Sequence, residues 1–135
     1  MEYKQFCPVA KASELLGERW TFLIIRELLM GGRRFNELQR GLAQISPTML
    51  TKRLNELAAN GLVVRKKIPG QKGHEYYLSS AGKELSPVIK ALGIALSTAG
   101  HCSASAHFLF DLGGRFSNGS KLVTSPSLAD KRTEL

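Results

Sequence analysis

Two short amphipathic segments joined by a tight turn constrain the fold of this chain more than any other feature. The first segment carries Phe35, Leu38 and Leu42 at spacings of three and four, which predicts a short helix. After the turn, Ser46-Pro47 opens a longer helix, with the serine as N-cap and the proline at the first helical position. Two helices joined in this way form a helix-turn-helix unit.

The second of these helices is expected to cover residues 47–60, and it is amphipathic. Leu50, Leu54 and Leu57 form one apolar stripe, and Gly61 ends the helix. At 100° per residue, the opposite face is small or polar and able to hydrogen-bond. That face carries Thr48, Lys52, Asn55 and Ala59, flanked by Thr51.

A basic hairpin follows this helix directly. Residues 62–68 and 75–78 read as two strands, and the Pro-Gly-Gln-Lys-Gly-His run at 69–74 reads as the turn between them. Helices are expected at 8–16, 19–30 and about 80–96, with a kink or a new start at Pro87 in the last. The order predicts a mainly α fold with a small β-hairpin wing, a winged helix-turn-helix.

In such a fold the second helix enters the DNA major groove, led by its N-terminal residues. The wing, about 63–78, lies on the DNA backbone or minor groove. Arg53 lies nearer the buried edge, where it would reach a phosphate or brace the fold. The candidate residues of the recognition helix are Ser46, Thr48, Met49, Thr51, Lys52, Arg53 and Asn55. The candidate wing and backbone contacts are Arg33, Arg34, Arg65, Lys66, Lys67, Lys72 and His74.

The charge distribution supports a polyanionic partner. The chain has 19 Lys and Arg against 11 Asp and Glu, a formal net charge of +8. Residues 33–72 hold nine basic and two acidic residues, so +7 of the +8 lies in this segment. Basic charge clustered in this way is typical of nucleic-acid binding.

At this point the chain resembles a known family, the HxlR-type winged helix-turn-helix transcriptional regulators. The resemblance covers roughly residues 6–92 and rests on GERW, RRFNEL, ISPTMLTKRLNEL-x-x-x-GL and YYLSSAGKEL, in that order. It implies a cytoplasmic, bacterial-type regulator that binds double-stranded DNA as a homodimer. Where the family often has a basic residue, this chain has Thr48.

The resemblance also implies that dimers form through the first and last helices, here residues 8–16 and 81–96. The candidate interface residues are Leu85, Val88, Ile89, Leu92 and Leu96. Family members usually carry a Trp or charged residues just after this segment, whereas Gly93-Ile94-Ala95 follows here. This difference weakens the expectation that the chain makes the usual dimer contact of the family.

Cys7 is a candidate sensor of oxidants or small electrophiles, because several members of the family use a cysteine at this place. Unpaired N–H groups at a helix N-terminus favour the thiolate form of a cysteine, and Lys4 and Lys11 are close in sequence. The alternative is a small capping or interface residue with an inert thiol.

Enzymatic, metal and cofactor sites are not predicted. The chain has no paired carboxylates, phosphate loop or nucleophile elbow, and His101, Cys102 and His107 lack a second ligand pair nearby. The alternative to a DNA-binding regulator is a winged-helix module that binds proteins or RNA. Such a module would more often expose apolar residues on the helix at 47–60.

We expect residues 1–97 to form the DNA-binding domain with its dimerisation helices, and residues 98–135 to form a poorly ordered tail. No charged residue occurs in 91–110, but serine, histidine and glycine dilute this stretch, so we expect no membrane span. Two widely separated cysteines and a start without an apolar signal region favour the cytoplasm.

Overall fold

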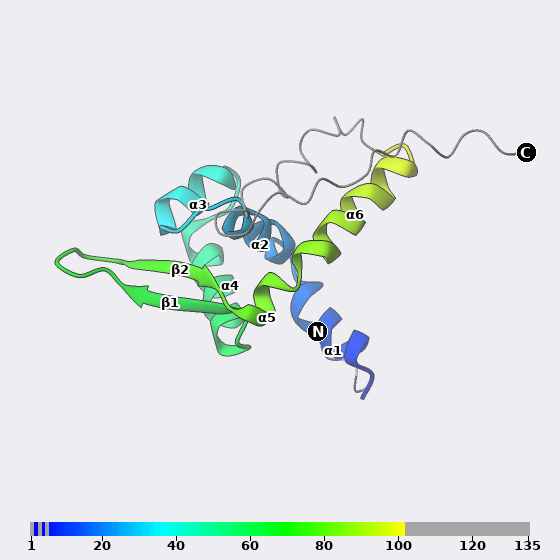
Figure 1. Ribbon diagram of the computed structural model, residues 1–135, viewed down its shortest axis with the longest axis horizontal. Helices are drawn as coiled ribbons and strands as arrows, with labels where there is room; N and C mark the ends of the chain where they lie inside the picture. Colours follow the sequence, from blue (N-terminus) through cyan, green and yellow to red (C-terminus); the bar gives the residue numbers. More distant parts are fainter. Residues whose placement is uncertain (1, 3, 5, 102–135) are drawn as a thin grey trace, which may run out of the picture.

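The computed structural model describes residues 2, 4 and 6–101. Within them the chain runs through four helices, a hairpin and two more helices (Figure 1). The elements are α1 Pro8–Leu16, α2 Thr21–Leu29, α3 Phe35–Gly41, α4 Pro47–Ala59, β1 Val63–Lys67, β2 His74–Leu78, α5 Ser80–Lys83 and α6 Ser86–Thr98. The predicted mainly α fold with a small hairpin is confirmed. Residues 102–135, most of the predicted tail, lie outside the described part.

The hydrophobic core lies where α2, α3, α4 and the base of the hairpin meet. The predicted leucine stripe of α4, Leu50, Leu54 and Leu57, is fully buried there. Ile24 and Leu28 of α2 face it and are buried too. This core holds α4 by one side only, so the opposite side of the helix stays outside.

The sequence predicted that the second helix begins at Arg19, but α2 begins at Thr21. Trp20 has φ of +76°, the left-handed region, and a helix cannot run through a residue in that conformation. Within α2, Leu23 is 39 % exposed, whereas Thr21 and Ile25 are buried. The later start leaves the helix shorter, and its buried face includes Thr21.

The two strands form an antiparallel hairpin, with Val63 opposite Leu78 and Lys67 opposite His74. His74, expected in the turn, is the first residue of β2. The loop before α3 also pairs with β2, since the Tyr76 N–H donates to the Arg33 carbonyl at 2.8 Å. An isolated bridge joins Arg34 to Glu75 next to it. The loop before α3 thereby attaches the wing to the rest of the fold, through a pairing that the sequence did not reveal.

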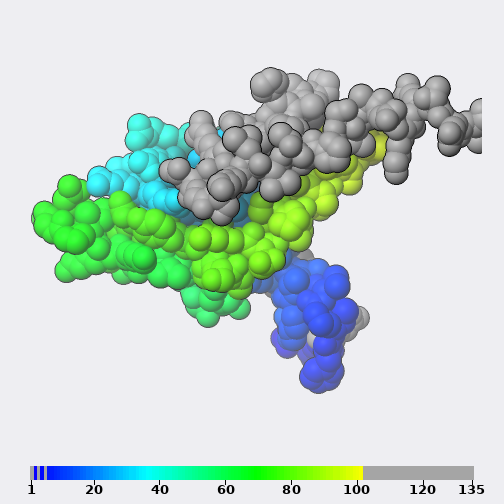
Figure 2. Space-filling view, viewed as in Figure 1, coloured from blue at the N-terminus to red at the C-terminus, as the bar shows by residue number. Residues whose placement is uncertain are grey.

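The last helical segment breaks at Pro87, as expected, and α6 starts anew beside it after the short α5. Leu85 and Ile89 pack against the core. Farther along, α6 leaves the body of the molecule in Figure 1, and Val88, Leu92 and Leu96 are exposed. Helix α1 also has no buried residue and stands out from the rest of the described surface (Figure 2).

No helix in residues 2, 4 and 6–101 is long and apolar enough to cross a membrane.

Candidate nucleic-acid interface

The N-terminus of α4 is capped as the sequence predicted. The Ser46 hydroxyl accepts a hydrogen bond from the Met49 N–H at 3.2 Å, and the proline follows at the start of the helix. This satisfies one of the free N–H groups of the first turn and defines where the helix begins. The first turn of α4 therefore has a definite position on the core.

The outer side of α4 is exposed and polar, as predicted. Thr48, Lys52 and Asn55 are all exposed there, whereas Met49 is half-buried and packs against the core. The Thr51 hydroxyl, also exposed, donates to the Pro47 carbonyl at 2.9 Å. The hydroxyl, amine and amide groups of this side match the groups that read base edges in a major groove.

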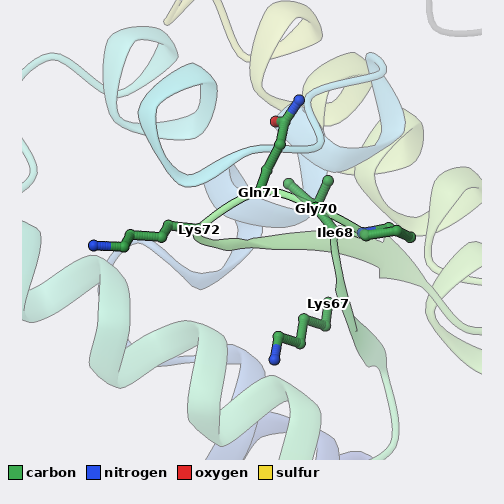
Figure 3. A pocket seen from close by; sticks show the side chains of 6 residues that line it. Lys67, Ile68, Gly70, Gln71 and Lys72 are labelled. Atoms are coloured by element: carbon green, nitrogen blue, oxygen red, sulfur yellow. The ribbon is translucent and has the colours of Figure 1, made fainter.

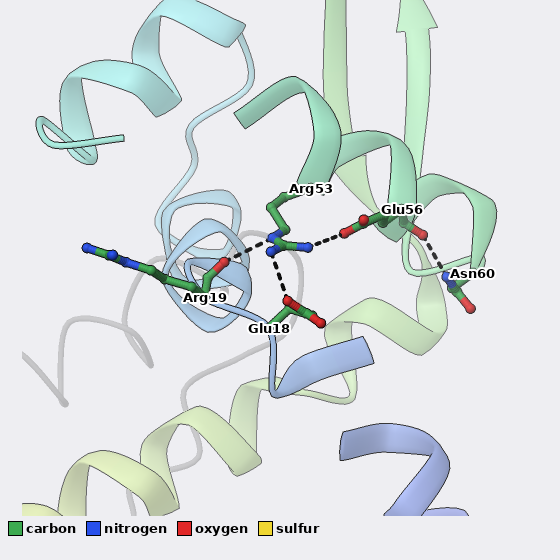
Figure 4. Close-up of polar contacts among 5 residues, drawn as sticks. All are labelled: Glu18, Arg19, Arg53, Glu56 and Asn60. Atoms are coloured by element: carbon green, nitrogen blue, oxygen red, sulfur yellow. Dashed lines mark hydrogen bonds and ion pairs between the residues drawn. The ribbon is translucent and has the colours of Figure 1, made fainter. Parts of the chain in front are cut away.

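Arg53 takes the second of the two roles expected for it and braces the fold. It is 5 % exposed, and its guanidinium donates to the Glu18 carboxylate at 2.9 Å and to the Glu56 carboxylate at 2.6 Å (Figure 4). Its Nε donates to the Arg19 carbonyl at 3.0 Å. Because its donors point inward, its placement among the DNA-contacting residues is corrected. Arg53 instead joins α4 to the segment between α1 and α2.

The hairpin carries the basic residues that were predicted for the wing. Arg65, Lys66, Lys67 and Lys72 are exposed, and His74 is half-buried. Figure 3 shows Lys67 and Lys72 extending from the tip in different directions around a shallow hollow. Gly70 and Gly73 have φ of +71° and +119°, which residues with a side chain rarely adopt, so the turn requires both.

The two arginines before α3 lie against the wing. The Arg33 guanidinium carbon lies 4.7 Å from the centroid of the Tyr77 ring, and the Lys66 amine lies 5.0 Å from the same centroid. Arg34 donates to the Gln71 side chain of the turn at 3.0 Å. No signal in the sequence indicated that Tyr77 belongs to this surface, because its contact with Arg33 joins residues 44 positions apart.

Glu37 caps the start of α3 from within the helix. Its carboxylate accepts hydrogen bonds from the backbone N–H groups of Arg33 at 2.8 Å and Arg34 at 3.0 Å. These bonds favour the ionised form, and those from Arg34 and then Arg33 lower the pKa of Glu37 below its ordinary value. The loop that carries both arginines is therefore tied at one end to α3 and at the other to β2.

Cys7 lies at the N-cap of α1 and is exposed, with a free thiol. Its side chain caps no N–H group of the helix, and only its carbonyl bonds to the helix, accepting from the Lys11 N–H at 3.1 Å. Cys102 and His107 of the rejected metal motif lie outside the described residues. Among the described ones, no three His, Cys, Asp or Glu side chains are grouped to hold a metal ion.

A capped helix with a polar outer side, set on a three-helix core beside a basic hairpin, defines a winged helix-turn-helix protein. The sequence model of the HxlR-like helix-turn-helix family matches residues 15–99. The chain belongs to this family, as its resemblance predicted.

Individual proteins that are similar in sequence to this chain are also described as HTH-type transcriptional regulators. YvaP of Bacillus subtilis, an uncharacterized HTH-type transcriptional regulator, is 38% identical over 91 residues, which cover 66% of this chain and 84% of YvaP. Mb3122 of Mycobacterium bovis, described in the same words, is 45% identical over 85 residues, or 62% of this chain and 53% of Mb3122. The chain thus spans about half the length of the latter.

Solved structures show the same fold. The reduced form of the transcriptional regulator YodB from B. subtilis superposes with a TM-score of 0.60 at 34% identity. The match covers 68% of this chain and 92% of the YodB chain. YodB has also been solved after diamide treatment and with a bound quinone.

Proposed function

We propose that this protein is a homodimeric transcriptional regulator that binds a specific sequence of double-stranded DNA through the outer side of α4. It acts in the bacterial cytoplasm, uses no cofactor and catalyses no reaction. Residues 1–97 form the working unit, with α4 in the major groove and the wing on the DNA backbone or minor groove. The base-reading residues are Ser46, Thr48, Met49, Thr51, Lys52 and Asn55. The wing and backbone contacts are Arg33, Arg34, Arg65, Lys66, Lys67, Lys72 and His74.

One observation carries the proposal: the outer side of α4 is exposed, polar and free of large apolar side chains. Eight large hydrophobic residues are exposed in the described part of the chain, and none of them belongs to α4. An interaction module that docks proteins through this helix would present apolar surface there. Polar groups beside a basic wing fit base edges flanked by phosphates.

The homodimer is proposed from the two terminal helices. Neither α1 nor α6 buries a residue within one protomer. Leu92 and Leu96 are 43 % and 56 % exposed, and Val9 of α1 is exposed as well. A second copy would cover these side chains and place two α4 helices at two half-sites of one operator.

The proposed input is oxidation or alkylation of Cys7. Its thiol is exposed at the edge of α1, a helix of the proposed interface, so a modified side chain there would change how the two protomers meet. YodB, which this chain resembles, has been crystallised after treatment with diamide and with a quinone. Replacing Cys7 by Ser tests this input. Diamide should release the wild-type protein from its operator and leave the variant bound, and equal release of both would contradict the proposal.

The DNA-binding proposal is tested by letting the purified protein select duplexes from a random-sequence pool. Fluorescence anisotropy then measures its affinity for the selected duplex at two salt concentrations, with random DNA as competitor. We expect binding that falls with salt and survives the competitor. Binding no tighter than to random DNA would contradict sequence-specific regulation and favour the protein- or RNA-binding alternative.

A further inference from the structure

Two cations of the interface converge on one aromatic ring. Arg33, from the loop before α3, and Lys66, from β1, both lie within 5.0 Å of the Tyr77 ring centroid. Cations are attracted to the face of an aromatic ring, so the ring gives both flexible side chains a preferred place. It also holds two like charges close together without neutralising either of them.

An acidic residue stands next to this pair and could neutralise it. Glu75 lies directly opposite Lys66 in the hairpin, a position where opposite charges usually attract. Yet the structure gives Lys66 no ion pair with Glu75, nor Arg33 an ion pair with any described acid. Instead the Tyr77 hydroxyl donates a hydrogen bond to the Glu75 carboxylate at 2.7 Å. The carboxylate is thereby engaged with the tyrosine.

The backbone keeps this arrangement in register. The Tyr76 N–H donates to the Arg33 carbonyl at 2.8 Å, and Arg34 bridges to Glu75. The loop that carries Arg33 therefore moves with the strand that carries Tyr77. The bond to Glu75, followed by burial, raises the pKa of Tyr77, so its hydroxyl keeps its proton and remains a donor.

We propose that Tyr77 is a positioning residue of the wing: its ring gathers Arg33 and Lys66, and its hydroxyl keeps Glu75 away from Lys66. Both cations are then available to the phosphates of a DNA backbone. This inference rests on the proposed function, because it assumes that the wing lies against DNA. It adds a residue that carries no charge and need not touch the DNA itself.

The test is the salt dependence of binding to a random-sequence duplex, which requires no knowledge of the operator. Log K falls as log salt concentration rises, and each phosphate contact adds about 0.9 to the steepness of this fall. The slope is this steepness, taken as a positive number. Lys66→Ala should therefore lower the slope by about 0.9. Tyr77→Phe keeps the ring but frees Glu75 to pair with Lys66, so it should lower the slope by a similar amount.

The double variant Tyr77→Phe/Glu75→Gln should restore the wild-type slope, because the neutral amide cannot pair with Lys66. Glu75→Gln alone should leave the slope unchanged. Tyr76→Phe is the matched control: it removes a hydroxyl from the neighbouring residue, which points to the buried face of the hairpin, and should also leave the slope unchanged. Circular dichroism establishes that each variant is folded.

Two results would overturn the inference while leaving DNA binding intact. The first is a Tyr77→Phe slope equal to that of the wild type. The second is a slope that rises by about 0.9 in Glu75→Gln, which would mean that Glu75 already neutralises Lys66; this result remains decisive even if Tyr77→Phe does not fold. If the wild-type protein itself shows no salt-dependent binding, the proposed function fails and this inference fails with it.

Discussion

The central unit, α2 through α5, and the two terminal helices, α1 and α6, are built in different ways. Every buried hydrophobic residue of the described chain lies between Ile24 and Leu78. The terminal helices bury none and project away from this unit, with exposed apolar side chains (Figures 1 and 2). The buried core therefore lies within the central unit, where Leu16 of α1 and Ile89 of α6 pack against its edge, and the other apolar side chains of the terminal helices are the surface proposed to meet a second protomer.

The helices also differ in whether a side chain caps their N-terminus. Side chains cap the N-termini of α3, α4 and α5, through Glu37, Ser46 and Ser79 respectively. The N-cap residues of α1 and α6, Cys7 and Leu85, make no side-chain cap. Helices whose ends are fixed locally belong to the unit proposed to read DNA. Helix α2 of the central unit has no side-chain cap either, and it is held by the burial of Ile24, Ile25 and Leu28 in the core.

The largest effect should come from emptying the core beneath α4. Leu54→Ala removes a fully buried side chain and should lower the free energy of unfolding by about 2–5 kcal/mol. Asn55→Ala, one residue away on the exposed side, should change it by less than about 0.5 kcal/mol. Urea denaturation measures both. Equal effects would mean that α4 does not lie on the core as described.

Removing the brace between α4 and the α1–α2 segment should have the next largest effect. Arg53→Ala deletes three hydrogen bonds of a buried guanidinium and should cost about 1–3 kcal/mol. Arg53→Lys should recover only part of the loss, because one ammonium cannot reproduce the planar fork. Lys52→Ala is the neighbouring control for stability. A neutral Arg53→Ala would show that α4 needs no such brace.

A charge on α6 should act on the dimer and spare the protomer. Leu92→Asp would bury a carboxylate in the proposed interface and should weaken dimerisation at least tenfold, about 1.4 kcal/mol. Ile94→Asp, an exposed position on the opposite side of α6 from Leu92, is the matched control. Sedimentation velocity across a concentration series measures both. A wild-type sedimentation profile for Leu92→Asp would exclude this face of α6 from the interface.

The smallest effect should be a pH-dependent one at the start of α3. The pKa of Glu37 is lowered in the folded protein, so its contribution is present above the ordinary glutamate pKa of 4.5 and is lost as pH falls through the lower, folded value. Because this side chain is exposed and its interactions are screened by solvent, Glu37→Gln should cost less than about 0.5 kcal/mol at pH 7 and still less at acid pH. Thermal unfolding at both pH values checks this. A pH-independent difference would contradict the assigned cap.

Much of this architecture follows from local signals in the sequence. Ser46-Pro47 and the leucine spacing of α4 predict where that helix starts and which side it buries, because both depend on residues within a few positions. The break at Pro87 is equally local. The polar outer side of α4 then follows by geometry from the buried stripe.

The remaining features depend on residues far apart in the chain. The burial of Arg53 requires Glu18, 35 positions away, which no helical projection of α4 includes. The left-handed Trp20 shortens α2 against local helix preference, since non-glycine residues rarely adopt that conformation. The pairing of Arg33 with β2, and hence the contact of Arg33 with the Tyr77 ring, likewise arises only when the loop and the hairpin meet.

The central claim, that the exposed side of α4 reads bases, is tested most directly by Lys52→Ala on two duplexes, one selected by the protein and one random. Fluorescence anisotropy should show a loss of about 1–3 kcal/mol on the selected duplex and a much smaller loss on the random one. Equal losses on both would assign Lys52 to a phosphate, and no loss on either would place DNA recognition elsewhere. Either of these results would contradict the account.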